Sequence, residues 1–128
     1  MISAFRRATH SFLSEQDLLP VHEFIPDDLT ALPCVVIGGI TLADGAEQGT
    51  FDLSMPLFVC GRRVGDDDSQ NELAEFVDHV VVILGGTKGR HAHDHHFAVT
   101  RADPQVVTVA GQDVPAYSLT VETTVLNC

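Results

Sequence analysis

The chain has 128 residues, 45% of them apolar and 20% charged, so it is long enough to bury one domain core without disulfides or metals. Eighteen acidic and seven basic residues give a net charge of −11, which excludes electrostatic binding of nucleic acid and disfavours an anionic membrane surface. The longest clean apolar run, residues 80–84, is too short to span a bilayer, and the first residues carry no secretory signal.

The three cysteines, Cys34, Cys60 and Cys128, form no CxxC pair, which favours a reducing compartment. Cys34 and Cys60 lie in apolar runs. We expect both to be buried thiols that pack as small hydrophobic side chains.

The first quarter of the chain divides into a helix and an arm. Ile2, Phe5, Phe12 and Leu13 fall near one helical face, which predicts a helix over residues 2–14. Three prolines then predict irregular or extended structure over residues 18–32. Residues 1–32 are therefore expected to form an N-terminal helix and a proline-punctuated arm.

Two strands are predicted next. Residues 34–37 are a β-branched apolar run, typical of a buried strand, and residues 43–49 indicate a loop. Residues 51–60 alternate in polarity, which predicts a strand with one strongly buried face. Pro56 cannot donate to a sheet ladder, so it indicates an edge or a bulge.

A central helix is predicted from residue 69. Ser69-Gln70-Asn71-Glu72 matches a capping box, and three aspartates before it suit the positive end of the helix dipole. Six apolar residues follow at the spacing of one helical face: Leu73, Phe76, Val77, Val80, Val81 and Leu84. Gly85 supplies the stop, and residues 85–96 indicate a long loop.

The C-terminal part predicts a hairpin. Residues 97–109 indicate a strand interrupted at Asp103 and Pro104, and residues 111–113 indicate a turn. Residues 117–125 alternate in polarity as a final strand, so the last two strands are expected to pair antiparallel.

These elements predict a single α+β domain over residues 1–128, with the sheet and the central helix in residues 33–126. The expected order is α-β-β-α-β-β. The expected architecture is a two-layer sandwich, with two helices packed on one face of an about four-stranded, mostly antiparallel sheet. The other face carries polar and threonine side chains and is expected to be wet or to face a partner.

A histidine tract, His91, His93, His95 and His96 with Asp94, is the most unusual local feature. Neutral imidazole binds zinc and nickel, and alternate residues of an extended stretch point to one side. A loop does not hold such ligands in place, so the four histidines are weak metal candidates and a solvated loop is the simpler interpretation. No catalytic or cofactor motif is present, so we expect no enzyme activity, no cofactor and no metal.

The order of the segments along the chain is similar to that of a known protein family. A proline-preceded strand at residues 32–38 is followed by a strand ending in Arg62, an acidic loop, a helix that begins at Ser69, and a terminal strand within residues 111–121. Over residues 30–126 this layout resembles the tail terminator (tail-completion) proteins of long-tailed, siphovirus-type bacteriophages. The histidine tract is not part of that pattern.

The resemblance implies a structural virion protein without cofactor. It implies a ring, usually of six subunits, that caps the tail tube, stops its polymerisation and joins it to the head connector. The implied partners are further copies of the chain, the tail tube protein and the connector or neck protein, while DNA passes through without specific binding. The implied location is the virion tail, after assembly in the bacterial host cytoplasm. Six copies of a chain of net charge −11 carry about −66, and a negatively lined channel repels DNA.

The candidate contacts to neighbouring subunits and to the tube are charged and aromatic residues: Phe5, Arg6, Arg7, Phe24, Arg62, Arg63, Asp66, Asp67, Lys88 and Arg90. Two alternatives stay open. One is a head–tail connector or neck subunit of the same assembly, and the other is a small metal-binding or ligand-binding α+β protein that uses residues 91–96.

Overall fold

The computed structural model describes residues 2–16, 19–24, 33–61, 67–85, 97–109 and 112–126. Two helices and six strands follow one another in the order α1 (Ile2–Glu15), β1 (Val21–His22), β2 (Cys34–Ile37), β3 (Thr41–Asp44), β4 (Thr50–Cys60), α2 (Asp67–Gly85), β5 (Ala98–Val109) and β6 (Gln112–Leu126).

The predicted four-stranded sheet in the order α-β-β-α-β-β is wrong. The sheet is mixed and has six strands in the spatial order β1-β2-β4-β6-β5, with β3 paired to β4 beside β2. Only β1 and β2 run parallel, and the other pairs are antiparallel. The two additional strands, β1 and β3, lie in segments without hydrophobic alternation.

Both additional strands pair with a neighbouring strand, and of their residues Val21 of β1 also packs against the inner core. β1 has two residues, both half-buried, and it lies in the arm that was expected to be irregular or extended. All four residues of β3 are exposed, and the strand overlaps the predicted loop at residues 43–49. β3 turns into β4 through Gly49, whose φ of 81° suits glycine.

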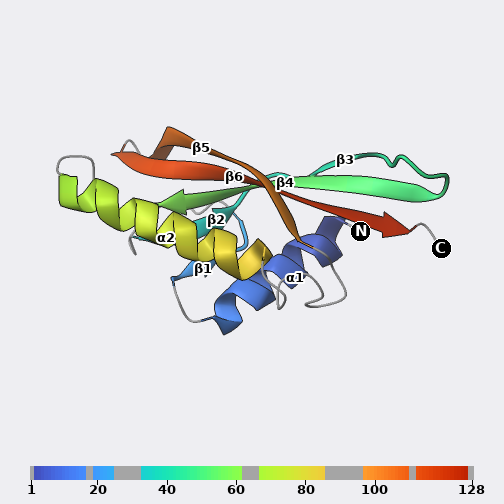
Figure 1. Ribbon diagram of the computed structural model, residues 1–128, viewed down its shortest axis with the longest axis horizontal. Coiled ribbons are helices and arrows are strands. Elements are labelled where there is room, and N and C mark those ends of the chain that lie inside the picture. The colour runs from blue at the N-terminus through green and yellow to red at the C-terminus, as the bar shows by residue number, and fades with distance from the viewer. Residues whose placement is uncertain are drawn as a thin grey trace.

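The two helices lie on the same face of the sheet (Figure 1). The apolar sides of α1, α2 and the facing strands form one cluster of seventeen buried residues, with bulky side chains from each layer. On β4 this cluster contains Leu53, Met55, Leu57 and Val59, all with no exposed surface. We refer to this side of the sheet as the inner face.

Phe97 joins α1 to the sheet. Its ring stacks against Phe5 at 5.9 Å and against Phe12 at 5.7 Å between centroids. Phe97 is 1% exposed and immediately precedes β5. Three aromatic rings therefore fill the space between α1 and the start of β5.

The opposite face, here called the outer face, is not uniformly polar. A second buried cluster consists of Cys34, Val36, Cys60, Val114 and Ala116. Cys34, Val36 and Cys60 alternate with Val35 and Val59 of the inner face along β2 and β4, so they point the other way. On β6, Ala116 is the direct partner of Cys60. The expected polar outer face is therefore correct only for part of the sheet.

Pro56 lies in the middle of the central strand β4, at a position where the missing N–H has no cost. Its carbonyl accepts a hydrogen bond from the Gly38 N–H, at 2.8 Å, on the side away from β6. The N and C=O of one extended residue point to the same side, so the absent donor also faces this side. There β2 has ended and β3 has not begun.

The central helix begins earlier than its capping-box match. α2 starts at Asp67, so Ser69 lies in its first turn. Acidic residues stabilise a first helical turn, which explains why the helix extends back over Asp67 and Asp68. The predicted apolar face is confirmed, because Leu73, Val77, Val80 and Leu84 are buried.

Candidate interaction surfaces

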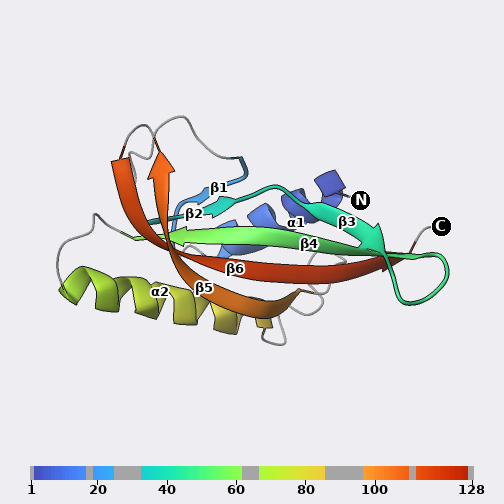
Figure 2. The ribbon, with the colours of Figure 1, turned by 90° about the horizontal axis from the view of Figure 1, so that it is seen from above.

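The two edges of the sheet are formed by different strands. On one side β5 is the last strand, with twelve residues, and on the other side lie the short strands β1 and β3. Within the described residues neither β5 nor β3 has a further strand on its outer side. The molecule therefore presents two sheet edges that are formed by strands of different length, β5 on one side and β1 and β3 on the other (Figure 2).

The free edge of β5 contains a proline, Pro104. The Gly61 N–H donates to the Pro115 carbonyl of β6, so alternate residues of β6, beginning with Ala116, face β5. Gln105 is opposite Ala116, so its backbone N–H and C=O point toward β6. The backbone groups of the neighbouring residues Pro104 and Val106 therefore point outward, to the free edge. Pro104 removes one donor from the free edge, a feature that discourages unwanted pairing with other strands. The strand itself runs through Asp103 and Pro104, so the predicted interruption there is wrong.

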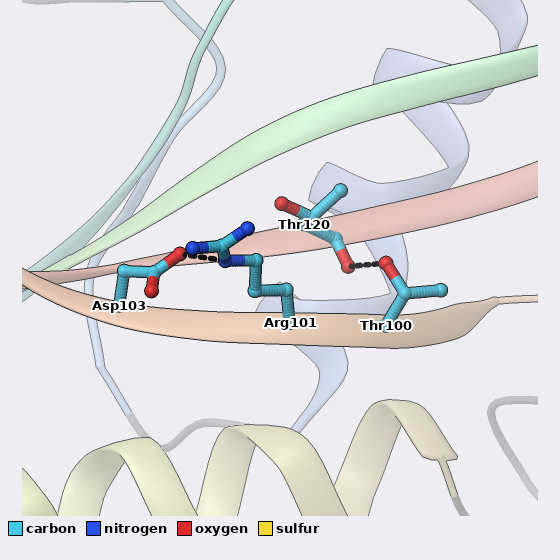
Figure 3. Close-up of polar contacts among 4 residues, drawn as sticks. All are labelled: Thr100, Arg101, Asp103 and Thr120. Atoms are coloured by element: carbon cyan, nitrogen blue, oxygen red, sulfur yellow. Dashed lines mark hydrogen bonds and ion pairs between the residues drawn. The ribbon is translucent and has the colours of Figure 1, made fainter.

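The irregularity of β5 lies at Thr100 instead. The register shifts between Val99 and Arg101, which leaves Thr100 as the extra residue of a bulge. Figure 3 shows that Thr100 donates to the Thr120 carbonyl at 3.5 Å, while Arg101 pairs with Asp103 at 2.6 Å. Arg101 and Asp103 are well exposed, so this ion pair contributes little to stability.

An apolar groove of about 380 Å³ runs between α2 and β5. Val82 on α2 is 70% exposed, the highest value among the exposed large apolar residues. The groove is lined by Ala74, Val77, Asp78, Val81, Val82, Ala102 and Tyr117.

A second hollow, of about 500 Å³, lies over β3, β4 and β6 at the end away from the outer cluster. Its lining is rich in hydroxyls and carboxylates: Thr41, Ala43, Asp52, Leu53, Ser54, Ala98, Glu122, Thr123 and Thr124. The Thr124 hydroxyl donates to Oδ1 of Asp52 at 2.8 Å, which orients that carboxylate. This hollow offers hydrogen-bond acceptors to a basic group of a partner.

The predicted contact residues of the N-terminal part differ in exposure. Phe5 has no exposed surface and packs in the core, so it offers nothing to a partner. Arg6 donates to the Glu23 carbonyl at 3.0 Å and lies 5.0 Å over the ring of Phe24. Arg7 is exposed and Phe24 is 67% exposed. Arg6 thus holds α1 to the segment after β1, while Arg7 and Phe24 remain available at the surface.

The remaining predicted residues lie outside the part of the chain that the structure describes. These are Arg62, Arg63, Asp66, Lys88, Arg90 and the histidines at 91, 93, 95 and 96, while Asp67 is described only through its backbone. Among the residues described, no group of three or more histidine, cysteine or acidic side chains is placed to hold a metal ion.

The apolar groove was not predicted, although the sequence contains a pattern that indicates it. The five residues 80–84 are all apolar, whereas one buried helix face needs only some of them. Val82 falls outside the predicted face and is the residue left exposed. An apolar run that is wider than the buried face therefore indicates a helix with a second apolar side.

The two cysteines predicted to be buried have no exposed surface and lie opposite one another in the β2–β4 register. A hydrogen bond between their side chains lowers the pKa of Cys34 and raises the pKa of Cys60, and burial opposes ionisation of both.

Within the described residues, no helix is both long and apolar enough to cross a bilayer. No protein-family model matches the chain, and no curated protein matches it significantly.

Proposed function

We propose that this chain is a ring-forming structural subunit of a siphovirus-type phage tail: a tail terminator that caps the tail tube and joins it to the head connector. The observation that carries the proposal is the pair of unlike sheet edges, β5 on one side and β3 on the other. A closed ring needs two different surfaces on each subunit, because each copy contacts its neighbours head to tail. The order of segments along the sequence, which resembles such proteins, supports the same assignment.

The charge of the chain also supports this proposal. A ring of chains that each carry −11 repels DNA from its channel, so the genome passes without binding. In this role the partners are other copies, the tube protein and the connector protein, and the location is the virion tail.

Native mass spectrometry of the untagged chain, without added metal, tests the ring. We expect a species of six chains of 13.8 kDa each. A monomer that carries one zinc ion would contradict the ring and support the metal-binding alternative. Replacing His93 and His95 by alanine together would then remove the zinc and lower the melting temperature.

Two edge variants test the head-to-tail arrangement. Val106→Lys changes β5, where the side chain is 60% exposed, and Leu42→Lys changes β3, where it is 37% exposed. Each variant alone should fail to form the ring, because each disables one of the two surfaces. Ile2→Lys, a change of the same kind at a site of α1 that is 39% exposed and lies on neither edge, is the matched control and should leave the ring intact.

Mixing the two edge variants sharpens this test. Each variant keeps one intact edge, so the mixture should give a dimer with one copy of each and no ring. Homodimers of either variant would show that like edges meet, which contradicts a head-to-tail ring.

A further inference from the structure

The cysteine pair on the outer face is buried and is also placed for the two thiols to react with each other. Cys34 is the first residue of β2 and Cys60 is the last residue of β4, and the two are direct partners in the antiparallel register. Val36, Val114 and Ala116 complete the cluster around them. Neither cysteine is bonded to another.

The backbone places the two sulfurs within reach of a covalent bond. The hydrogen bond from Gly38 to Pro56 fixes the alternation of the ladder, so that Cys34 and Cys60 occupy a hydrogen-bonded position. At such positions the Cα atoms lie about 5.5 Å apart. Disulfides span Cα separations of about 4.4–6.8 Å, so this separation lies within the range that a disulfide bridges.

The same position makes the bond easy to reduce. Cβ atoms of facing residues lie about 4.5–5.5 Å apart and are closer at the other type of position. A disulfide prefers about 3.5–4.5 Å, so the bond draws the two strands together under strain. Strained disulfides have less negative potentials and are the labile ones.

We propose that Cys34 and Cys60 are a redox modification site, which forms a reversible disulfide between β2 and β4 when the chain meets a small-molecule disulfide. The thiolate of one cysteine of the pair breaks the S–S bond of the reagent, forms a mixed disulfide and releases one thiolate. The other cysteine then loses its proton and attacks the sulfur of the first, which forms the bond between Cys34 and Cys60 and releases the second thiolate.

Access to the pair comes from opening of the strand ends. Among the described residues β1 pairs with Val35 and Val36 and does not extend to Cys34, whose own sheet pairing is with β4. Cys34 and Cys60 both lie at strand ends, where local opening needs far less free energy than unfolding of the inner face. The reaction is therefore slow but does not require the chain to unfold.

The experiment uses the full chain with Cys128→Ser, so that only the proposed pair can react. The folded protein is treated with 2-hydroxyethyl disulfide, unfolded in acid-quenched denaturant, alkylated with N-ethylmaleimide at neutral pH and weighed intact. We expect no alkylation and a mass lower by two hydrogen atoms, a peptide that links residues 34 and 60, and full reversal by dithiothreitol. The oxidised chain should melt at a higher temperature than the reduced chain.

Two outcomes would overturn the proposal: two alkylated thiols after prolonged treatment, or a separate mixed disulfide on each cysteine. Single variants test the mixed-disulfide step. Cys60→Ser and Cys34→Ser should each retain one molecule of reagent as a mixed disulfide on the remaining cysteine, because the second thiol that would displace it is absent. A variant that retains no reagent would contradict this step, and the unsubstituted pair tests the bond even where a variant fails to fold.

Discussion

The two faces of the sheet bury their side chains in different ways. The inner face lies under both helices and contains the largest buried residues, among them Phe5, Phe12 and Phe97. The outer cluster contains only cysteine, valine and alanine among its buried members. Helices stand off a sheet and leave room for bulky side chains, whereas the outer cluster is filled by small residues.

The outer cluster draws its members from the ends of several strands. Val107 of β5 and Val114 of β6 pair with each other, and both pack with the residues of β2 and β4. Figure 2 shows β5 and β6 bending together at this hairpin end. The hydroxyl-rich and carboxylate-rich hollow lies at the other end of the same face. One face of the sheet thus combines a small core at one end with a polar hollow at the other.

The largest predicted effect is a loss of stability at the inner face, which is compared with an equivalent change at the exposed edge of β5. Phe97→Ala should lower the free energy of unfolding by about 3–5 kcal/mol, because it removes the ring between Phe5 and Phe12 and leaves a cavity. Val106→Ala is the control on the same strand, since its side chain is 60% exposed and should change stability by less than about 0.5 kcal/mol. Urea denaturation measures both. Equal effects would mean that α1 is not held by the aromatic stack.

A neighbouring pair of valines compares the two faces directly. Val35 faces the inner cluster and is 2% exposed, while Val36 faces the outer cluster and is 5% exposed. Each change to alanine removes two buried methyl groups and should cost about 2 kcal/mol. Denaturation of the two variants under the same conditions gives the ratio of their losses in free energy of unfolding. A negligible cost at Val36 would show that the outer cluster does not act as a core.

The parts of the fold that could be predicted from the sequence are those that carry a local period. The helical spacing identified the buried side of α2, and strict alternation identified Leu53, Met55, Leu57 and Val59 on β4. β1 and β3 carry no such period, since one has two residues and the other is exposed throughout. Their positions depend on backbone pairing with β2 and β4, which the hydrophobic pattern of the two segments does not record.

The interaction surfaces were less predictable for a related reason. Phe5 and Phe24 are both aromatic residues of the N-terminal part, yet one has no exposed surface and the other is 67% exposed. Composition and spacing identify which residues are apolar, but exposure is decided by what the rest of the chain places over them. The expectation for Phe5 failed because Phe97, far along the sequence, covers it.

A pair of adjacent glycines tests how tightly the outer face is packed where β2 ends. A Cβ added at Gly38 would lie 2.7 Å from Cγ of Pro56 and 2.9 Å from Cε2 of Phe58, whereas one added at Gly39 meets nothing within 4 Å. Gly38→Ala should cost about 1–2 kcal/mol through overpacking, because the proline ring cannot move aside. Gly39→Ala should be close to neutral. Thermal melts compare the two, and equal melting temperatures would mean that the outer face yields easily at this point.

The smallest predicted effect lies at the margin of the inner layer, where α1 meets the segment after β1. Arg6→Ala removes both the hydrogen bond to the Glu23 carbonyl and the contact with the Phe24 ring, and should cost about 1 kcal/mol because both interactions are partly exposed to water. Arg7→Ala removes the same charge from an exposed position one residue along and should cost less than about 0.5 kcal/mol. Phe24→Leu in the Arg6→Ala background should add little, since the ring has then lost its cation. Denaturation of the single and double variants forms a thermodynamic cycle, and additive costs would show that the arginine and the ring do not interact.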